Sequence, residues 1–325
     1  MLYNVLKIYI TMENKLKGKK VFVTTLAFCG NNYLCEKLIS TGAIVKFNDT
    51  GRRLSPEELL HGLNSSDYAI IGLDKINKSN IPNISNNLKA ISKYGVGLDN
   101  IDIDACEEKN INVLYSKGVN KRSVSELTIG TALMLMRNIY FTSNELKNGN
   151  WVKKGGVELS GKKFGIIGLG NIGKDLVNLL QPFGCDIYIN DIDPDQEFIA
   201  INNLTFSSKE EIYRKCDIIS LHVPLTTKTS NMITKSELSI MKSSVIIINT
   251  ARGELIDLDD LEHFLINKKI GGAALDVYDE EPPTRMELLS LPNLVNTPHI
   301  GGNSKEAVIA MGISAINNLI NFNKN

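Results

Sequence analysis

The 325-residue sequence has no excess of charge of either sign. Lysine and arginine together number 36, as do aspartate and glutamate, so the formal net charge at pH 7 is zero. A chain without net positive charge has no general electrostatic attraction to nucleic acid or to an anionic membrane surface. We therefore expect a small-molecule partner, and neither nucleic acid nor a membrane.

Cysteine is also scarce. The chain has five, at Cys29, Cys35, Cys106, Cys185 and Cys216. They are scattered, odd in number, and show neither C-x-x-C nor Cys/His metal spacing. We therefore predict no metal site and expect a reduced, cytoplasmic setting.

The chain does not open on a long hydrophobic run. Its first segment, MLYNVLKIYI, spans ten residues, contains Lys7, and leads into the charged MENKLKGKK without a small-residue cleavage site. These features predict neither a membrane span nor a signal peptide. Met12 is an alternative start to Met1.

What the sequence does contain is the composition of a globular protein, with 43% hydrophobic and 22% charged residues, over a length that fits two domains. Short apolar runs alternate with helical stretches, which is typical of a parallel α/β sheet. The first series of predicted strands is VFVTT, AIVKFN, DYAIIG, LKAIS and INVLYS. Between them SPEELLHGL begins with Ser55 and has Glu58 three residues later, a capping box that predicts a helix start.

A second series follows a long helical run over 123–151. Six strands are predicted there: KFGIIG, CDIYIND, CDIISLH, SVIIINT, AALDVY and NLVNTP. Six strands with intervening helices are what a doubly wound nucleotide-binding domain needs. A last helix is predicted after residue 303, with Asn303 as its N-cap and Glu306 three residues on.

The segment GIIGLGNIGKDL has Gly168, Gly170 and Gly173 in G-x-G-x-x-G spacing, directly after a strand and opening a helix. The first glycine permits a tight turn, the second lets a pyrophosphate approach the backbone, and the third lets helix and strand pack closely. Alone, the pattern also fits a simple strand-to-helix turn. Asp191, eighteen residues after Gly173 at the end of the next strand, favours a site for NAD, because a carboxylate there binds ribose hydroxyls and repels a 2′-phosphate. Asp193 is a rival two residues on, better placed as a turn residue beside a proline.

Arg252, Glu281 and His299 each follow an apolar strand of the second series. Ligands in doubly wound sheets bind at the carboxyl ends of the strands, so all three could reach one cleft. A guanidinium can grip a carboxylate, and a histidine backed by a carboxylate can exchange protons near neutral pH. Singly, each residue also has a structural interpretation, but together after a dinucleotide signature they predict an active site. The other three histidines differ: His61 and His263 are expected at the surface, and His222 has no evident acidic partner.

These residues resemble the D-isomer-specific 2-hydroxyacid dehydrogenases, and among them the phosphoglycerate dehydrogenase-like members. The resemblance runs from about Val21 to about Asn317. It rests on seven segments, KYGVGLDNID at 93–102, NKRSVSELTIG at 120–130, GLGNIG at 168–173, HVPLT at 222–226, NTARGELID at 249–257, AALDVYDEEPP at 273–283 and TPHIGG at 297–302.

The resemblance implies a Rossmann-type NAD domain, 120–299, inserted into a smaller flavodoxin-like substrate domain made of 1–119 and 300–325. It implies a homodimer built on the NAD domains, with the helix near 123–147 in the interface. It also implies hydride transfer with His299 as proton donor and acceptor, Glu281 as its carboxylate partner and Arg252 as the substrate-binding arginine. The substrate carboxylate is expected on the backbone of Gly95, Val96 and Gly97.

For the cofactor, the resemblance places Asn171 and Ile172 at the pyrophosphate, Asp191 at the adenosine ribose and Asp276 at the nicotinamide end. Val223 and Thr250 are expected to form walls of the site. The remaining cofactor positions expected are Gly168, Gly170, Gly173, His222, Pro224, Ala251 and His299, with Gly301 and Gly302 letting the backbone pass close to the nicotinamide.

The substrate implied is 3-phosphoglycerate with its product 3-phosphohydroxypyruvate, which would connect the chain with serine biosynthesis. However, the cation that phosphoglycerate dehydrogenases place after the strand DYAIIG is not obvious here. Lys75 and Lys93 are candidate replacements, Arg52 and Arg53 more distant ones, and each also fits a solvated surface charge. Glycerate with hydroxypyruvate, or another 2-hydroxy acid, is the alternative. An NAD-sensing binding protein similar to the C-terminal-binding corepressors is a further alternative with the same motifs.

Overall fold

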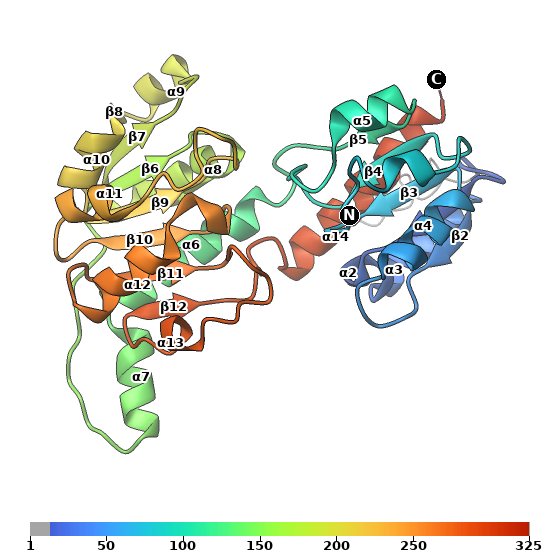
Figure 1. Ribbon diagram of the computed structural model, residues 1–325. Helices are drawn as coiled ribbons and strands as arrows, with labels where there is room; N and C mark the ends of the chain where they lie inside the picture. The colour runs from blue at the N-terminus through green and yellow to red at the C-terminus, as the bar shows by residue number, and fades with distance from the viewer. Residues whose placement is uncertain (1–13, 325) are drawn as a thin grey trace, which may run out of the picture. The chain divides into compact units, whose positions relative to one another are not determined.

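The computed structural model describes residues 14–324, which form two compact units (Figure 1). One unit contains the described residues up to Asn120 together with those from Asn303 onward, and the other runs from Lys121 to Gly302. The opening segment MLYNVLKIYI and Met12 lie outside the described residues. All five cysteines lie within them, and each is a free thiol.

The first unit is built on a five-stranded parallel sheet of order β2-β1-β3-β4-β5. All five predicted strands are confirmed. This order is that of flavodoxin-like doubly wound sheets. The strands are β1 (Lys20–Val23), β2 (Ile44–Phe47), β3 (Tyr68–Ile71), β4 (Ala90–Lys93) and β5 (Asn112–Leu114).

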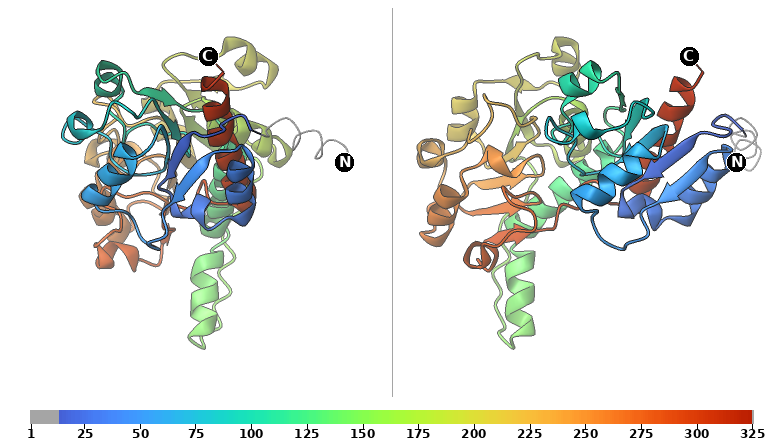
Figure 2. Two further views of the ribbon diagram at one scale, coloured as in Figure 1. Left: turned by 90° about the vertical axis from the view of Figure 1, so that its right-hand side faces the viewer. Right: turned by 45° about the vertical axis from the view of Figure 1, so that its right-hand side comes forward.

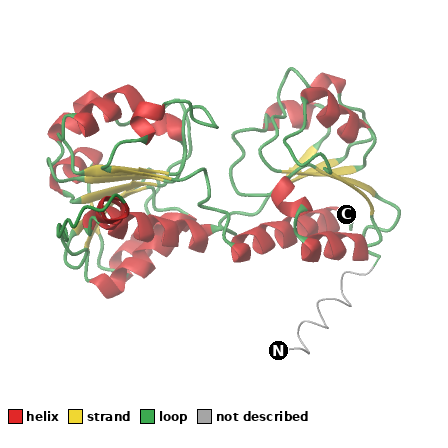
Figure 3. Ribbon diagram, turned by 90° about the horizontal axis from the view of Figure 1, so that it is seen from below, coloured by secondary structure: helices red, strands yellow, loops and turns green. Residues whose placement is uncertain are grey.

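Helices cover both faces of this sheet (Figure 3). Successive residues of β3 alternate between two cores: Tyr68 and Ile70 pack with α3 (Asn32–Ser40) and α14 (Lys305–Phe322), and Ala69 and Ile71 pack on the other face. The other elements of the unit are α2 (Leu26–Cys29), α4 (Pro56–Asn64), η1 (Ile81–Asn83) and α5 (Ile103–Glu108). Burial on both faces explains why β3, in the middle of the sheet, has no charged or strongly polar residue.

Of the two predicted helix caps in the first unit, the one at the start of α4 is confirmed and the one at the start of α14 is wrong by one residue. Ser55 and Glu58 form the expected capping box at the start of α4. The N-cap of α14 is Ser304, not Asn303, because the Ser304 hydroxyl accepts the N–H of Ala307 three residues on (3.1 Å).

The second unit has a seven-stranded parallel sheet of order β12-β11-β10-β9-β6-β7-β8. All six predicted strands are present, but the prediction of six strands is wrong by one, because the sheet has a seventh. The missed strand, β8 (Thr205–Phe206), pairs with Tyr188 and Ile189 of β7 and has only two residues, both exposed, so it leaves no apolar run in the sequence. The predicted strands are β6 (Lys163–Ile167), β7 (Asp186–Asn190), β9 (Ile218–Leu221), β10 (Ile246–Asn249), β11 (Gly272–Leu275) and β12 (Leu294–Asn296).

Helices cover both faces of this sheet as well (Figure 3). One core contains side chains of α6 (Lys121–Met136), α8 (Asn171–Leu180) and α9 (Gln196–Ile201), and the other those of α10 (Lys209–Lys215), α11 (Lys235–Ile240) and α12 (Leu258–Ile266). Shorter elements are η2 (Gln181–Phe183), η3 (Gly253–Leu255) and α13 (Met286–Leu289). The fold of this unit is the predicted Rossmann type.

The prediction of one helix over 123–151 is wrong, because α6 ends at Met136 and a separate helix, α7 (Ile139–Lys147), follows it. Asn138 lies in the left-handed region (φ 51°), which asparagine tolerates and which interrupts the helix. The Met136 carbonyl accepts the N–H of Val157 instead (2.8 Å). No residue of α7 is buried, and the helix projects away from the sheet of its own unit (Figures 1 and 2).

Over residues 14–324, the apolar stretches of the helices are too short to cross a lipid bilayer.

Candidate active site

The glycine-rich turn lies between β6 and α8, and each of its glycines has a different structural reason. Gly168 has a φ of 105°, and a Cβ there would lie 2.5 Å from the His222 carbonyl oxygen. A Cβ on Gly173 would collide with the Gly168 carbonyl oxygen, so helix and turn could not pack. Gly170, the N-cap of α8, has no protein atom within 4 Å of a built Cβ. The space over Gly170 therefore stays open to a ligand.

That open space lies at the N-terminus of α8, which includes Asn171 and Ile172 in its first turn. The first N–H groups of a helix have no partner within it, and its dipole is positive at this end. Both features favour an anion such as a pyrophosphate.

Asp191 follows β7 and lies beside this turn. One carboxylate oxygen accepts the N–H of Leu169 (2.6 Å), and the other accepts the N–H of Asp193 (2.9 Å). The Asp193 side chain is exposed and takes no part in this contact. Asp191 is therefore held at the edge of the glycine-rich turn. Lys174, a cation on α8, is paired with Asp195 rather than with Asp191.

Two buried polar atoms beyond the next strands have no hydrogen-bond partner within the described part of the chain. They are Nδ1 of His222, after β9, and the hydroxyl of Thr250, after β10. The other ring nitrogen of His222 lies 2.8 Å from the Ser220 hydroxyl, and burial lowers the pKa of His222 to about 4. Buried polar groups are rarely left unpaired. Together with the Gly170 space, they fit a polar ligand such as NAD lying across the carboxyl ends of these strands.

His299 and Glu281 form a hydrogen-bonded dyad. Nδ1 of His299 lies 2.9 Å from both carboxylate oxygens of Glu281, and the N–H of Tyr278 also donates to that carboxylate (3.4 Å). The His299 side chain is 35% exposed and that of Glu281 25%, so ligand and solvent can reach both. A carboxylate on Nδ1 fixes the orientation and the tautomer of the ring.

His299 has an unusual backbone conformation for its residue type, with a φ of 56°. A side chain in this region costs of order 1–3 kcal/mol and persists where neighbouring structure holds it, often at functional sites.

Arg252 lies in the turn after β10, partly exposed. The turn is held by Asn249, whose side chain is fully buried. The Asn249 amide donates to the Arg252 carbonyl oxygen (2.7 Å) and its oxygen accepts the N–H of Ala251 (3.1 Å). Arg252 itself donates to the Ala251 carbonyl oxygen (2.5 Å).

Asp276, which the resemblance places at the nicotinamide end of the cofactor, has hydrogen-bond partners within its own unit. It is 2% exposed, and its carboxylate accepts from the Thr297 hydroxyl and from the N–H groups of Ile300 and Gly301. Gly301 is buried against this carboxylate, whereas Gly302 is partly exposed.

The expected carboxylate-binding loop belongs to the first unit, where it follows β4. Gly95 has a φ of 122°, and Gly95, Val96 and Gly97 are all partly exposed. Lys93, two residues before Gly95, is 4% exposed. Its ammonium group donates to the Gly72 carbonyl oxygen (2.6 Å) and to the Asn100 side chain (2.5 Å). The interpretation of Lys93 as a solvated surface charge is therefore wrong.

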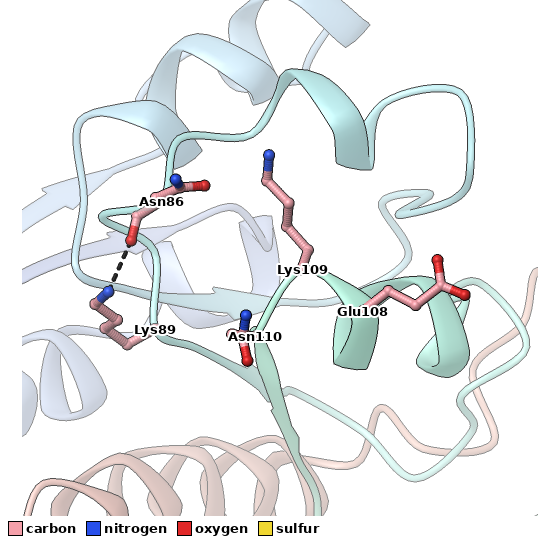
Figure 4. Close-up of a pocket in the computed structure, with 5 residues that line it drawn as sticks. All are labelled: Asn86, Lys89, Glu108, Lys109 and Asn110. Atoms are coloured by element: carbon pink, nitrogen blue, oxygen red, sulfur yellow. Dashed lines mark hydrogen bonds between the residues drawn. The ribbon is translucent and has the colours of Figure 1, made fainter.

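The other candidate cations of the first unit are at the surface. Lys75 and Arg53 are exposed, and Arg52 is paired with Glu58 (2.7 Å). A surface pocket of about 310 Å³ in this unit is lined by Asn86, Lys89, Glu108, Lys109 and Asn110 (Figure 4). The Lys89 ammonium group already donates to the Asn86 carbonyl oxygen (2.8 Å). None of the predicted site residues lines this pocket.

Several residues that shape the site were not predicted: Leu169, Asn249 and Thr297. Asn249 and Thr297 stand in the segments NTARG and TPHIGG. A polar residue at the end of a buried strand is the sequence signal that could have identified Asn249 and Thr297, whereas Leu169 has no such signal.

Comparison with known proteins gives one consistent result. The sequence model of the family described as "D-isomer specific 2-hydroxyacid dehydrogenase, NAD binding domain" matches residues 129–301. The chain is 38% identical to a hydroxypyruvate reductase of Thermotoga maritima, over 82% of this chain and 88% of that protein. It is 39% identical to a D-3-phosphoglycerate dehydrogenase of Methanocaldococcus jannaschii, over 80% of this chain and 50% of that protein, so it spans about half the length of that relative.

Among solved structures, the D-lactate dehydrogenase of Aquifex aeolicus, in complex with NAD and lactic acid, superposes with a TM-score of 0.82 at 25% identity. The match covers 94% of this chain and 95% of that one.

Proposed function

This chain belongs to the D-isomer-specific 2-hydroxyacid dehydrogenase family, whose members are NAD-dependent oxidoreductases acting on CH–OH groups, and we propose that it interconverts a short D-2-hydroxy acid and its 2-oxo acid. The observation that supports this most strongly is the His299–Glu281 dyad, with Nδ1 2.9 Å from both carboxylate oxygens. It lies in the same unit as the glycine-rich turn.

In this proposal His299 moves the proton of the reaction. In oxidation, neutral His299 takes the hydroxyl proton at Nε2, and Glu281 stabilises the imidazolium that forms. In reduction, the imidazolium returns that proton to the carbonyl oxygen. Bound NAD supplies the hydride acceptor for oxidation, and NADH the donor for reduction. In oxidation the substrate loses a proton to His299 and a hydride to NAD, and in reduction it regains both.

Arg252 is proposed to bind the substrate. Its guanidinium can form two parallel hydrogen bonds to the substrate carboxylate and polarise the adjacent carbonyl. A separate proposal, which rests on the resemblance, is that the backbone of Gly95, Val96 and Gly97 in the first unit receives a substrate carboxylate. The first unit thus serves as substrate-binding domain and the second as NAD domain.

The cofactor is NAD, and its contacts are proposed from the geometry of the second unit. Gly168, Gly170 and Gly173, with Asn171 and Ile172, hold the pyrophosphate, and Asp191 binds the adenosine ribose. Nδ1 of His222 and the Thr250 hydroxyl, which have no hydrogen-bond partner within the described residues, are proposed to form hydrogen bonds with polar atoms of the cofactor. The other proposed contacts are Val223, Pro224, Ala251, Asp276, His299, Gly301 and Gly302.

Two substrates are proposed, each supported by a different observation. The similarity to phosphoglycerate dehydrogenase supports 3-phosphohydroxypyruvate. The similarity to hydroxypyruvate reductase over 88% of that protein supports hydroxypyruvate. The burial of Lys93 also favours hydroxypyruvate, because an ammonium group already bonded to Gly72 and Asn100 is poorly placed for a phosphate.

We also propose a homodimer formed by the second units, in a cytoplasmic setting. Every residue of α7 is at least partly exposed, and apolar side chains are prominent there: Ile139 is 50% and Leu146 57% exposed, and Trp151, just beyond the helix, is 78% exposed. Exposed apolar side chains grouped on one projecting element are typical of a protein interface.

The test is NADH oxidation with a panel of 2-oxo acids, comprising hydroxypyruvate, 3-phosphohydroxypyruvate, glyoxylate and pyruvate. We expect turnover with at least one of them, and the highest kcat/KM identifies the substrate. Binding of NADH without turnover of any 2-oxo acid would contradict the proposed function and would favour an NAD-sensing protein.

A further inference from the structure

Asp276 is a buried carboxylate that the proton and hydride transfers do not themselves require. It follows β11 directly, and its backbone N–H still donates to the Asn249 carbonyl oxygen of β10 (3.0 Å). One carboxylate oxygen accepts from the Thr297 hydroxyl (2.6 Å) and the Ile300 N–H (2.8 Å), and the other accepts from the Gly301 N–H (2.7 Å). The three donors lie on both sides of His299 in the sequence.

We propose that Asp276 is a positioning residue that holds the turn 297–301, and through it the His299 ring, in the geometry needed for proton transfer. The inference rests on the proposed function of His299. Hydrogen bonds to a carboxylate are about twice as strong as those between neutral groups. Three of them on one short turn can hold His299 in its left-handed conformation, which would otherwise be unfavourable.

Gly301 supports the same role independently. A Cβ built on Gly301 would lie 2.9 Å from the Asp276 carboxylate oxygen, so a larger residue would require this carboxylate, now 2.7 Å from the Gly301 nitrogen, to move. A second backbone bond, from the Thr297 N–H to the Leu275 carbonyl oxygen (3.0 Å), joins the start of the turn to the strand before Asp276. The turn is thus held against β11 by both backbone and side chain.

The inference differs from a role in binding the cofactor. A carboxylate has about four acceptor positions, and three are used by the turn. One position remains for an amide of the nicotinamide, so the two roles are compatible but predict different defects when Asp276 is changed.

Asn249 offers a matched comparison. It is also fully buried at a strand end, but it holds the turn of Arg252 through the Arg252 carbonyl oxygen and the Ala251 N–H. Loss of Asn249 should disturb substrate binding, whereas loss of Asp276 should disturb proton transfer.

The experiment compares Asp276→Asn, Thr297→Val, Thr297→Ser and Asn249→Ala in steady-state kinetics, with NADH binding measured by fluorescence. A displacement of about 1 Å at a reacting group can slow turnover about a hundredfold. We expect Asp276→Asn to lower kcat by about that factor. The NADH Kd should stay within about threefold of the unsubstituted protein, because an amide oxygen can still accept a hydrogen bond from the nicotinamide. The solvent deuterium isotope effect on kcat should rise, because proton transfer becomes rate-limiting. Thr297→Val should show a smaller change of the same kind, Thr297→Ser should recover most of it, and Asn249→Ala should mainly raise the substrate KM.

A readout without turnover completes the test. The chain has four histidines, so its imidazole NMR signals can be assigned with a His299→Ala variant. Asp276→Asn and Thr297→Val should move the His299 signal and leave those of His61 and His263 in place.

An unmoved His299 signal in both variants would overturn the inference. So would an Asp276→Asn variant with weakened NADH binding but normal kcat at saturating NADH. If Asp276→Asn does not fold, Thr297→Val decides by the same criteria. Full turnover by His299→Ala would instead contradict the proposed function, and the NMR result would still decide whether Asp276 positions the ring.

Discussion

His222 should make the stability of the protein depend on pH in a specific window. Its ring lies at the end of β9, bonded to Ser220 through one nitrogen, with the other nitrogen buried and without a partner in the described chain. Burial lowers the pKa of His222 from 6.5 to about 4 in the folded protein, because a charged imidazolium is poorly solvated there. The unfolded chain keeps the ordinary value.

The sign and size of the effect follow from linkage. Above pH 6.5 His222 is neutral in both states, and its full contribution to stability is present. As the pH falls from about 6.5 to about 4, only the unfolded state gains the proton, so stability is lost. Each pKa unit corresponds to about 1.36 kcal/mol, so a pKa difference of about 2.5 lowers the free energy of unfolding by about 3 kcal/mol below pH 4. About 2 kcal/mol of this should already be lost at pH 5.

The assay is urea unfolding of the unsubstituted protein and of His222→Gln at pH 7 and pH 5. Glutamine can keep a hydrogen bond to Ser220 but does not titrate. Other acid-sensitive groups are shared, so the difference between the two proteins isolates His222. His61→Gln, at an exposed position on α4, is the control and should keep the full pH dependence. Equal losses of stability in His222→Gln and the unsubstituted protein between pH 7 and pH 5 would refute the reasoning.

Three further predictions concern the second unit. Gly173→Ala should lower the free energy of unfolding by about 1–3 kcal/mol, because its Cβ meets the Gly168 carbonyl oxygen. Gly170→Ala should change the free energy of unfolding by less than about 0.5 kcal/mol but should weaken NADH binding. Urea unfolding measures the first effect and NADH fluorescence titration the second. Asp191→Ala should weaken NADH binding about tenfold to a hundredfold, the value of a hydrogen bond to a charged group. It should also reduce the preference of the protein for NADH over NADPH. An unchanged NADH Kd would show that Asp191 does not bind the ribose. Leu146→Glu should shift the mass measured by light scattering from dimer to monomer while Lys147→Glu, its exposed neighbour, should not; a dimer in both variants would exclude α7 from the interface.

Much of the fold could be predicted because the central strands of both sheets are buried on both faces. Such strands appear as nearly continuous apolar runs, as in Ile246–Asn249, and the capping box at Ser55 is a local signal. The errors arose where local signals were weak or ambiguous. The strand Thr205–Phe206 is short and exposed, and Asn138 breaks a helix whose apolar spacing continues beyond it.

The site could be predicted only as a set of residues after strands. Their positions at the ends of parallel strands follow from the α/β pattern, so His299 and Glu281 could be expected to meet. The contacts that shape the site join residues far apart in the chain, such as Asp276 with the turn 297–301 and Lys93 with Gly72. No local pattern identifies such partners, and for this reason the burial of Lys93 was missed.

The central claim is that His299 exchanges the proton of the reaction. The most direct measurement is the rate of NADH oxidation by His299→Ala with the best 2-oxo acid of the panel, alongside its NADH Kd. The account predicts a kcat lower by about a hundredfold to ten-thousandfold, the usual value of general acid–base catalysis. The NADH Kd should rise far less than kcat falls, because His299 is only one of many proposed contacts of the cofactor. A kcat equal to that of the unsubstituted protein would contradict it.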